Sequence, residues 1–109
     1  MVDLNSHSKH SVVDALIAFV DLTLYMKTCL RLEDLQAAAW MDSFFERLAQ
    51  IVESNEGVVV KFIGDAALIF FGSKAAEKGI LSLLKAKEEI DGWMQSEGYP
   101  SRLNVKILF

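Results

Sequence analysis

Two runs of strand-forming residues, Val58–Ile63 and Ala66–Phe71, are separated only by the pair Gly64-Asp65. Glycine and aspartate between two such runs are typical of a tight hairpin turn, so the segment predicts two adjacent antiparallel strands. The turn also brings one carboxylate, that of Asp65, to the edge of a very apolar segment. A carboxylate beside a core is costly unless it is solvated, hydrogen-bonded or bound to a cation. Asp65 therefore needs water or a partner from elsewhere in the chain.

Two further strands are predicted at the two ends of the chain. Ala15–Leu22 is a short apolar run, which is typical of a buried central strand. Arg102–Phe109 alternates polar with apolar residues, which is typical of a half-buried strand. With the hairpin, these runs make four strands.

Two helices are predicted between the strands. The first begins at Asp34 and ends at Asn55, with Gly57 in the left-handed position that follows many helices. The second begins near Lys74 and ends before Gly98. Apolar residues three to four apart are expected to face the core, namely Leu35, Ala38, Met41, Phe44, Phe45, Leu48, Ile51 and Val52 in the first helix, and Ile80, Leu83, Leu84, Lys87 (through its stem), Ile90, Trp93 and Met94 in the second.

The element order is therefore βαββαβ, which predicts a ferredoxin-like α+β fold. In that fold a four-stranded antiparallel sheet carries both helices on one face. Right-handed crossovers place the first strand beside the hairpin in the middle of the sheet. Residues 1–11 are polar and are expected to form a disordered tail in which His7 and His10 are solvated, and residues 12–109 form one domain.

Composition excludes several classes of function. The formal net charge is −4, from 11 basic and 15 acidic residues, so binding to nucleic acid is not expected. The single cysteine, Cys29, allows no internal disulfide and fits a reducing compartment, where an inert thiol is expected. No apolar run is long enough for a membrane span. These features predict a cytoplasmic globular domain. The 52% content of hydrophobic residues favours self-association through an apolar surface.

The predicted topology brings Asp21, at the end of the first strand, close to Asp65 at the hairpin turn. Two carboxylates at close range repel each other, and a divalent cation between them reverses the sign of that interaction. Carboxylate and main-chain oxygens are hard ligands, so Mg²⁺ or Mn²⁺ is the expected cation, and two such ions suit displacement at phosphorus. The simpler alternative is that Asp65 serves only the turn and Asp21 caps the segment that follows it.

Two motifs in this region resemble those of class III nucleotide cyclase catalytic domains. Members of that family typically read F-x-D-I-x-G-F-T after the first strand and K-x-I-G-D at the hairpin. The second motif is matched in full by Lys61, Ile63, Gly64 and Asp65, and the first is matched by Phe19 and Asp21. The resemblance extends over roughly Ala15 to Phe109.

The resemblance implies a role for each matched position. Asp21, Asp65 and the main-chain carbonyl of Leu22 are expected to bind two Mg²⁺ or Mn²⁺ ions, with no catalytic residue beyond these ligands. Lys61 is expected to contribute to recognition of a purine, although a solvated strand lysine is as good an interpretation. Thr23, Leu24 and Tyr25 fall where the family's backbone approaches the triphosphate. The implied ligand is a purine nucleoside triphosphate, converted to a 3′,5′-cyclic nucleotide in signalling, and the implied partner is a second copy or another cyclase domain.

The sequence also departs from the family. Leu24 stands where the motif has glycine, and Ala66 replaces the glycine that often follows G-D. The family's C-terminal half, with a base-selecting residue and an Asn/Arg pair for the transition state, is not represented before Phe109. Arg31, Arg47 and Arg102 lie outside the position of that arginine and are expected to be surface residues. Activity from this chain by itself is therefore expected to be weak or absent.

Two other functions remain open on these grounds. A non-catalytic regulatory or dimerisation module with a cyclase-like fold is favoured by the lost glycine and the apolar composition. A diguanylate cyclase shares the βαββαβ order, but its hairpin normally reads G-G-[DE]-E-F, whereas Phe62–Leu68 here reads F-I-G-D-A-A-L.

Overall fold

The predicted hairpin forms one side of a four-stranded antiparallel sheet in the computed structural model, which describes residues 15–108. Its strands are β2 (Gly57–Ile63) and β3 (Ala66–Phe71), and Gly64 turns between them with a positive φ of 60°. The other strands are β1 (Leu16–Leu22) and β4 (Leu103–Leu108), and the sheet order is β2-β3-β1-β4. Only the second strand of the hairpin pairs with β1, so β2 lies at an edge of the sheet and not in its middle.

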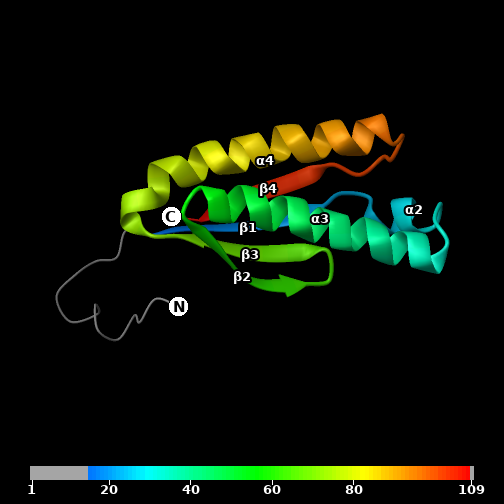
Figure 1. Cartoon of the computed structure of the whole chain (residues 1–109), viewed down its shortest axis with the longest axis horizontal. Coiled ribbons are helices and arrows are strands. Elements are labelled where there is room, and N and C mark those ends of the chain that lie inside the picture. The colour runs from blue at the N-terminus through cyan, green and yellow to red at the C-terminus, as the bar shows by residue number, and fades with distance from the viewer. Residues whose placement is uncertain (1–14, 109) are drawn as a thin grey trace.

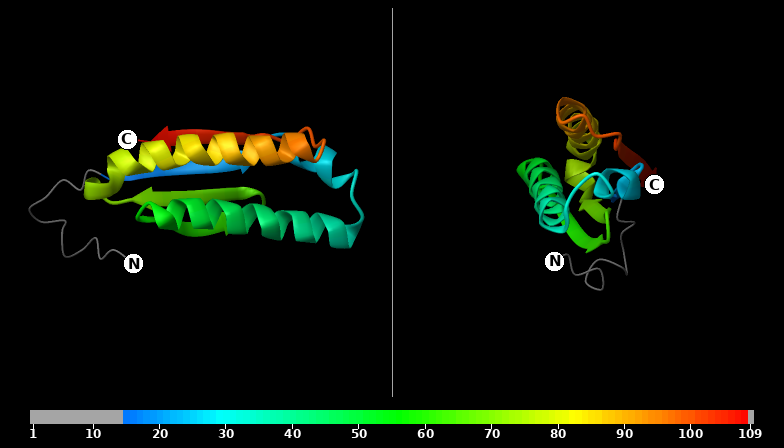
Figure 2. Two further views of the ribbon diagram at one scale, coloured as in Figure 1. Left: turned by 45° about the horizontal axis from the view of Figure 1, so that its top comes forward. Right: turned by 90° about the vertical axis from the view of Figure 1, so that its right-hand side faces the viewer.

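Both long helices, α3 (Asp34–Ser54) and α4 (Ala76–Ser96), cover the same face of this sheet (Figure 1), and Figure 2 shows the two layers end on. Two short elements precede them: α2 (Tyr25–Cys29) after β1, and the 3₁₀ turn η1 (Ser73–Ala75) before α4. The predicted ferredoxin-like α+β fold is confirmed. The predicted polar tail with His7 and His10, and the last strand residue Phe109, lie outside the described residues.

The core lies between the sheet and the helices. In β1 every second residue is buried, because alternate side chains of a strand point to opposite faces. The largest fully buried hydrophobic side chains come from all the strands except β2 and from both long helices. They are Phe44, Phe71, Leu16, Leu48, Ile69, Leu83, Ile90, Met94, Leu103, Val20 and Val52.

Several residues predicted to face the core do not. Leu35 is 86% exposed and Ala38 is also exposed, because the first turns of α3 extend past the hairpin end of the sheet (Figure 1). In α4, Leu84 is 61% exposed and Ile80 is 36% exposed. The buried stripe of α4 instead contains small residues, namely Gly79, Ser82 and Ala86 beside Leu83, Ile90 and Met94. Small side chains allow this helix to lie close to the sheet.

The glycine after α3 has a different role from the predicted one. The left-handed residue is Glu56, with φ 67°, whereas Gly57 is buried and begins β2. A Cβ atom on Gly57 would lie 2.4 Å from the ring of Phe71. Gly57 is therefore required by close packing against β3 and not by a positive φ.

A polar contact fixes α4 to the edge strand β4. One carboxylate oxygen of Asp91 accepts a hydrogen bond from the Leu103 amide at 2.7 Å, and the other accepts one from Lys87 Nζ at 2.8 Å. Lys87 also donates to the Leu103 carbonyl at 2.8 Å. Lys87 thus contributes through its amine as well as through its stem.

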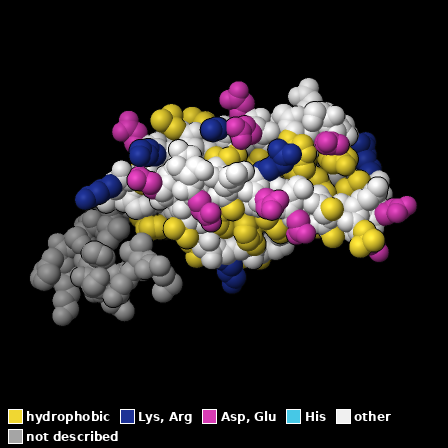
Figure 3. Space-filling view, in the orientation of Figure 1, with side chains coloured by type: hydrophobic (Ala, Val, Ile, Leu, Met, Phe, Trp, Pro, Cys, Tyr) yellow, Lys and Arg dark blue, Asp and Glu magenta, His cyan; other side chains and the backbone are white. Residues whose placement is uncertain are grey.

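The outer surface of the helical layer is mixed in character. Basic and acidic side chains alternate over it, with hydrophobic side chains between them (Figure 3). Within residues 15–108, neither the long helices nor the short ones combine the length and the apolarity that a bilayer crossing requires.

Candidate metal and nucleotide site

Asp21 and Asp65 are brought to the same end of the sheet. Asp21 is the penultimate residue of β1, and Asp65 follows Gly64 in the hairpin turn. The Leu22 amide donates a hydrogen bond to Asp65 Oδ2 at 3.2 Å. The Asp65 carboxylate therefore lies against the peptide bond that joins Asp21 to Leu22. Both aspartates are half-buried, so neither is fully solvated nor enclosed in the core.

The donor set at this point suits a hard divalent cation of the Mg²⁺ type. The two half-buried aspartates offer carboxylate oxygens as metal ligands. One oxygen of Asp65 accepts a single long hydrogen bond, from the Leu22 amide. No group of three or more His, Cys, Asp or Glu side chains within residues 15–108 could hold a metal by itself. Mg²⁺ is commonly bound by one or two carboxylates together with water and substrate phosphates. The residues fit such a site, with the remaining ligands expected from solvent and a triphosphate.

The segment after Asp21 is held in place by the opposite end of the described chain. The Thr23 amide donates to the Arg102 carbonyl at 2.8 Å, and the Arg102 amide donates to Thr23 Oγ1 at 2.9 Å. Of the residues predicted to lie near a triphosphate, Thr23 and Leu24 thus form a short, tethered loop between β1 and α2, and Tyr25 is the first residue of α2.

Leu24 keeps the backbone conformation that the motif's glycine favours. Its φ and ψ are 51° and 33°, in the left-handed region, and its side chain is 53% exposed. A left-handed conformation costs a residue other than glycine about 1–2 kcal/mol. The loop therefore places a leucine side chain at a backbone conformation that glycine adopts more readily.

Substituting Leu24 by glycine is expected to change the free energy of unfolding by less than about 0.5 kcal/mol. Relief of the left-handed strain, about 1–2 kcal/mol, offsets the larger backbone entropy of glycine and the loss of a half-buried leucine. Leu30→Gly is the matched control, because Leu30 has a φ of −67° and is 81% exposed. That control is expected to lose about 1 kcal/mol. If urea unfolding shows that both variants lose the same free energy of unfolding, the backbone strain inferred at Leu24 is contradicted.

Lys61 lies on the same face of the sheet as Asp21. It pairs with Leu68 across the hairpin, next to an irregularity between Val59 and Lys61, and it is exposed. Leu68 pairs in turn with Phe19 of β1, two residues before Asp21. In the described part of the chain Lys61 forms no ion pair, and its amine is accessible to a ligand on the open sheet face.

Tyr25 connects this loop to the aromatic residues at the end of the helical layer. Its ring stacks on Trp40 at a centroid distance of 6.0 Å, and Trp40 meets Tyr99 edge-on at 5.8 Å. A side-chain hydrogen bond with Cys29, burial, and electrostatic interactions with Cys29 and Asp65 raise the pKa of the Tyr25 hydroxyl. Tyr25 is therefore a neutral hydroxyl at physiological pH whose surroundings include the Asp65 carboxylate.

The three arginines considered in the sequence are already engaged. Arg31 donates to the Gly98 carbonyl at 2.8 Å, and Arg102 donates to the carbonyls of Tyr99 and Ser101 at 2.8 and 2.7 Å. The Arg47 guanidinium lies 4.4 Å from the centre of the Trp93 ring. Each of the three thus contacts a carbonyl or an aromatic ring within residues 15–108, and the prediction that none replaces the family's transition-state arginine stays a prediction.

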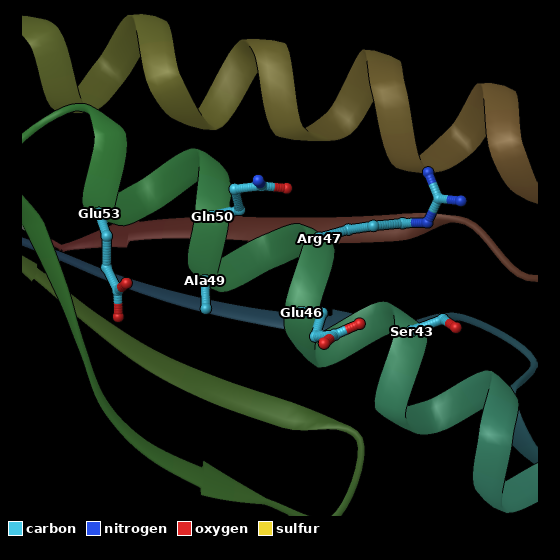
Figure 4. Close-up of a pocket in the computed structure, with 6 residues that line it drawn as sticks. All are labelled: Ser43, Glu46, Arg47, Ala49, Gln50 and Glu53. Carbon is cyan, nitrogen blue, oxygen red and sulfur yellow. The ribbon is translucent and has the colours of Figure 1, made fainter.

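A hollow on the helical layer lies apart from these residues. Figure 4 shows that its lining comes from α3 alone, namely Ser43, Glu46, Arg47, Ala49, Gln50 and Glu53. Side chains of a single exposed helix face enclose no ligand, so the hollow is not a binding site.

Two buried hydroxyls near the loop were not predicted from the sequence. Thr28 and Ser101 are both 0% exposed, and their oxygens lie 2.6 Å apart. Ser101 also donates to the Leu24 carbonyl at 3.3 Å. The two residues are far apart in sequence and belong to no recognised motif, so only the fold reveals that they meet beside the loop.

Comparison with known proteins gives matches by structure but none by sequence. No family model and no curated protein matches the sequence. Among solved structures, the adenylyl cyclase CyaB from P. aeruginosa matches with a TM-score of 0.79 and 17% identity over 87% of this chain and 55% of its own. A bacterial light-regulated adenylyl cyclase matches with a TM-score of 0.76 and 19% identity over 87% of this chain and 52% of its own.

The guanylyl cyclase Cya2 matches with a TM-score of 0.71 and 19% identity, over 85% of this chain and 52% of its own. This chain thus spans about half the length of each of the three solved structures. At these identities the matches concern the fold and not the chemistry. The chain has the fold of class III nucleotide cyclase domains, as its two sequence motifs predict.

Proposed function

We propose that this chain is a metal-binding, nucleotide-binding portion of a class III cyclase, acting in the cytoplasm on a purine nucleoside triphosphate. The observation that carries the proposal is the position of Asp65. Its carboxylate accepts a hydrogen bond from the Leu22 amide, directly beside Asp21. A turn aspartate that served only the hairpin would not need to contact the end of β1. Asp21, Asp65 and the Leu22 carbonyl are the proposed ligands of Mg²⁺ or Mn²⁺, two ions in the active state.

Each neighbouring residue has a proposed role toward the triphosphate. The backbone of Thr23, Leu24 and Tyr25 lines the phosphates, and Lys61 contacts the purine from the open sheet face. Bound divalent cations would acidify the attacking 3′-hydroxyl and neutralise the triphosphate. Loss of a transition-state cation typically costs a hundredfold to a thousandfold or more in rate, so strong cyclisation requires a partner that supplies one.

Metal-dependent nucleotide binding by the full chain is the direct test of this proposal. Calorimetric titration of ATP and GTP in millimolar Mn²⁺ is expected to show binding that disappears without metal and falls at least about tenfold in Asp65→Ala. Glu53→Ala is the matched control, because Glu53 is an exposed acid on α3 and its loss should leave binding unchanged. Equal binding by wild type and Asp65→Ala, or none by the wild type, would reject the proposal.

A regulatory or dimerisation module is the second candidate, and the open face of the sheet favours it. The strand register places on this face Ile17, Phe19, Asp21, Val58, Lys61, Ile63, Leu68, Phe70, Asn104, Lys106 and Leu108. Phe19 is 40% exposed, Val58 49% and Leu108 50%, so the centre and both edges of the face present apolar surface. Both signs of charge occur on it, through Asp21 and the two lysines. Such a face can be self-complementary in a twofold dimer, so a second copy of this chain is its proposed occupant.

Substituting Val58 by lysine is expected to weaken this self-association. The wild type should sediment as a dimer at roughly tens of micromolar, and Val58→Lys should shift it toward the monomer by placing an unpaired charge on the apolar face. An edge strand accepts lysine without loss of fold. Leu81→Lys on α4, where Leu81 is 63% exposed, is the control and should remain dimeric. A monomeric wild type, or a dimer unaffected by Val58→Lys, would contradict this interface.

A further inference from the structure

Thr28 and Ser101 form a hydroxyl relay that ends on the loop after Asp21. Ser101 donates to the Leu24 carbonyl at 3.3 Å, which leaves Thr28 as the donor of the 2.6 Å bond to Ser101. The Leu24 carbonyl also accepts the Thr28 amide at 3.1 Å. The left-handed residue of the loop is thus bound at its carbonyl by α2 and by the segment that leads into β4.

Burial makes the two hydroxyls of this relay depend on each other. Both residues are 0% exposed, and a buried hydroxyl without a partner costs stability, so each hydroxyl requires the other. The two direct bonds between Thr23 and Arg102 add a second connection between the same segments. Three hydrogen bonds therefore join the loop to the entry of β4, and the Thr28–Ser101 bond joins α2 to the same segment.

We infer that Thr28 and Ser101 are positioning residues for the proposed site: they hold Leu22–Tyr25 in the conformation that the metal and the triphosphate require. This inference rests on the proposed function. Neither hydroxyl reaches the ligand, because both are enclosed. Their effect is exerted through the Leu24 carbonyl and along the short backbone segment that leads from it back to the Leu22 amide, which contacts Asp65. Residues that orient the groups contacting a metal commonly alter its affinity about tenfold to a hundredfold.

The test compares Thr28→Val, which removes the hydroxyl but keeps the shape, with Thr28→Ser, which restores it. In the full chain, Thr28→Val is expected to raise the Kd for ATP with Mn²⁺ about tenfold, and Thr28→Ser to return it to within about twofold of the wild type. Ser101→Ala should match Thr28→Val, and the double variant should lose no more than either single one, because both belong to one relay.

Ser82→Ala separates positioning from a general loss of stability. The Ser82 hydroxyl is also buried, at 2% exposed, and donates to the Ile51 carbonyl at 3.4 Å between α3 and α4. This control is expected to lower the melting temperature without changing the Kd. Equal changes in Kd for Ser82→Ala and Thr28→Val at matched stability, or an unchanged Kd in Thr28→Val, would overturn the inference.

Amide hydrogen exchange on the unliganded chain gives a readout that does not depend on nucleotide. Thr28→Val should accelerate exchange at the Leu22 and Thr23 amides, which bond to Asp65 and Arg102, while core amides of β3 stay protected. Faster exchange with no ATP binding by the wild type would support the relay and reject the proposed function. Unchanged exchange in Thr28→Val would reject the relay itself.

Discussion

Gly79→Ala is expected to lower the free energy of unfolding by about 1–2 kcal/mol, although alanine is the better helix former by about 1 kcal/mol. Gly79 lies inside α4 on its buried stripe. A Cβ atom there would lie 2.6 Å from the Phe71 ring and 2.7 Å from Leu16 Cδ2. Real Cβ atoms do not approach other atoms so closely, so either the helix or the ring must move.

The Phe71 ring has no free direction in which to move. A second glycine, Gly57, also lies against the ring, since an added Cβ there would lie 2.4 Å from it, and Phe71 itself is 0% exposed. The ring thus lies between two glycines, one from α4 and one from β2. Overpacking a closed core typically costs about 1–3 kcal/mol, which exceeds the gain in helix propensity.

Gly92→Ala is the matched control for this prediction. Gly92 lies in the same helix and is exposed, and no atom lies within 4 Å of an added Cβ. This variant is expected to gain about 0.5–1 kcal/mol from helix propensity alone. Chemical denaturation monitored by circular dichroism measures both variants. If Gly79→Ala is as stable as Gly92→Ala, the close approach of α4 to the sheet is wrong.

The same close approach explains which parts of the helices could be predicted from the sequence. Large apolar residues at helical spacing correctly located α3 and α4 and placed Phe44, Leu83 and Ile90 in the core. The spacing of large apolar residues gave a wrong prediction where close packing requires small residues. It predicts that Leu84 is buried, and it gives no sign that Gly79 is. Exposure of Leu35 depends on where the sheet ends beneath α3, which is a tertiary property that no local pattern contains.

The candidate site could also be predicted only in part from the sequence. The hairpin motif and the strand order predicted that Asp65 would reach the end of β1, and the bond to the Leu22 amide is consistent with that expectation. The roles of Asp21, Lys61 and the loop residues as ligands stay predictions. α2 has only five residues and is not one of the two helices that the sequence predicts. Thr28 and Ser101 are brought together by that helix, and for this reason the relay could not be predicted.

Adding a class III cyclase domain without metal-binding aspartates is expected to raise cyclic nucleotide formation at least about a thousandfold over this chain alone. The resemblance implies that metal aspartates of one subunit face the Asn/Arg pair of the other. Residues 15–108 contain the two aspartates, but their three arginines are engaged elsewhere. If the proposed function is correct, the partner domain would supply the missing cation, and this chain would supply the metal ligands that the partner lacks.

Pairing and chemistry are measured separately in this experiment. Sedimentation of the mixture reports the mixed dimer, and conversion of ATP and GTP in Mn²⁺ reports turnover. Asp65→Ala in this chain should leave the mixed dimer intact and return turnover to background, because it removes a proposed metal ligand and lies in the hairpin turn, outside the strands that form the open face. Val58→Lys should weaken the dimer and lower turnover in proportion to the dimer lost.

Two outcomes would contradict this prediction. A mixed dimer that forms without turnover would contradict a catalytic role for Asp21 and Asp65 and would favour the regulatory module. The absence of a mixed dimer would contradict the open sheet face as the pairing surface.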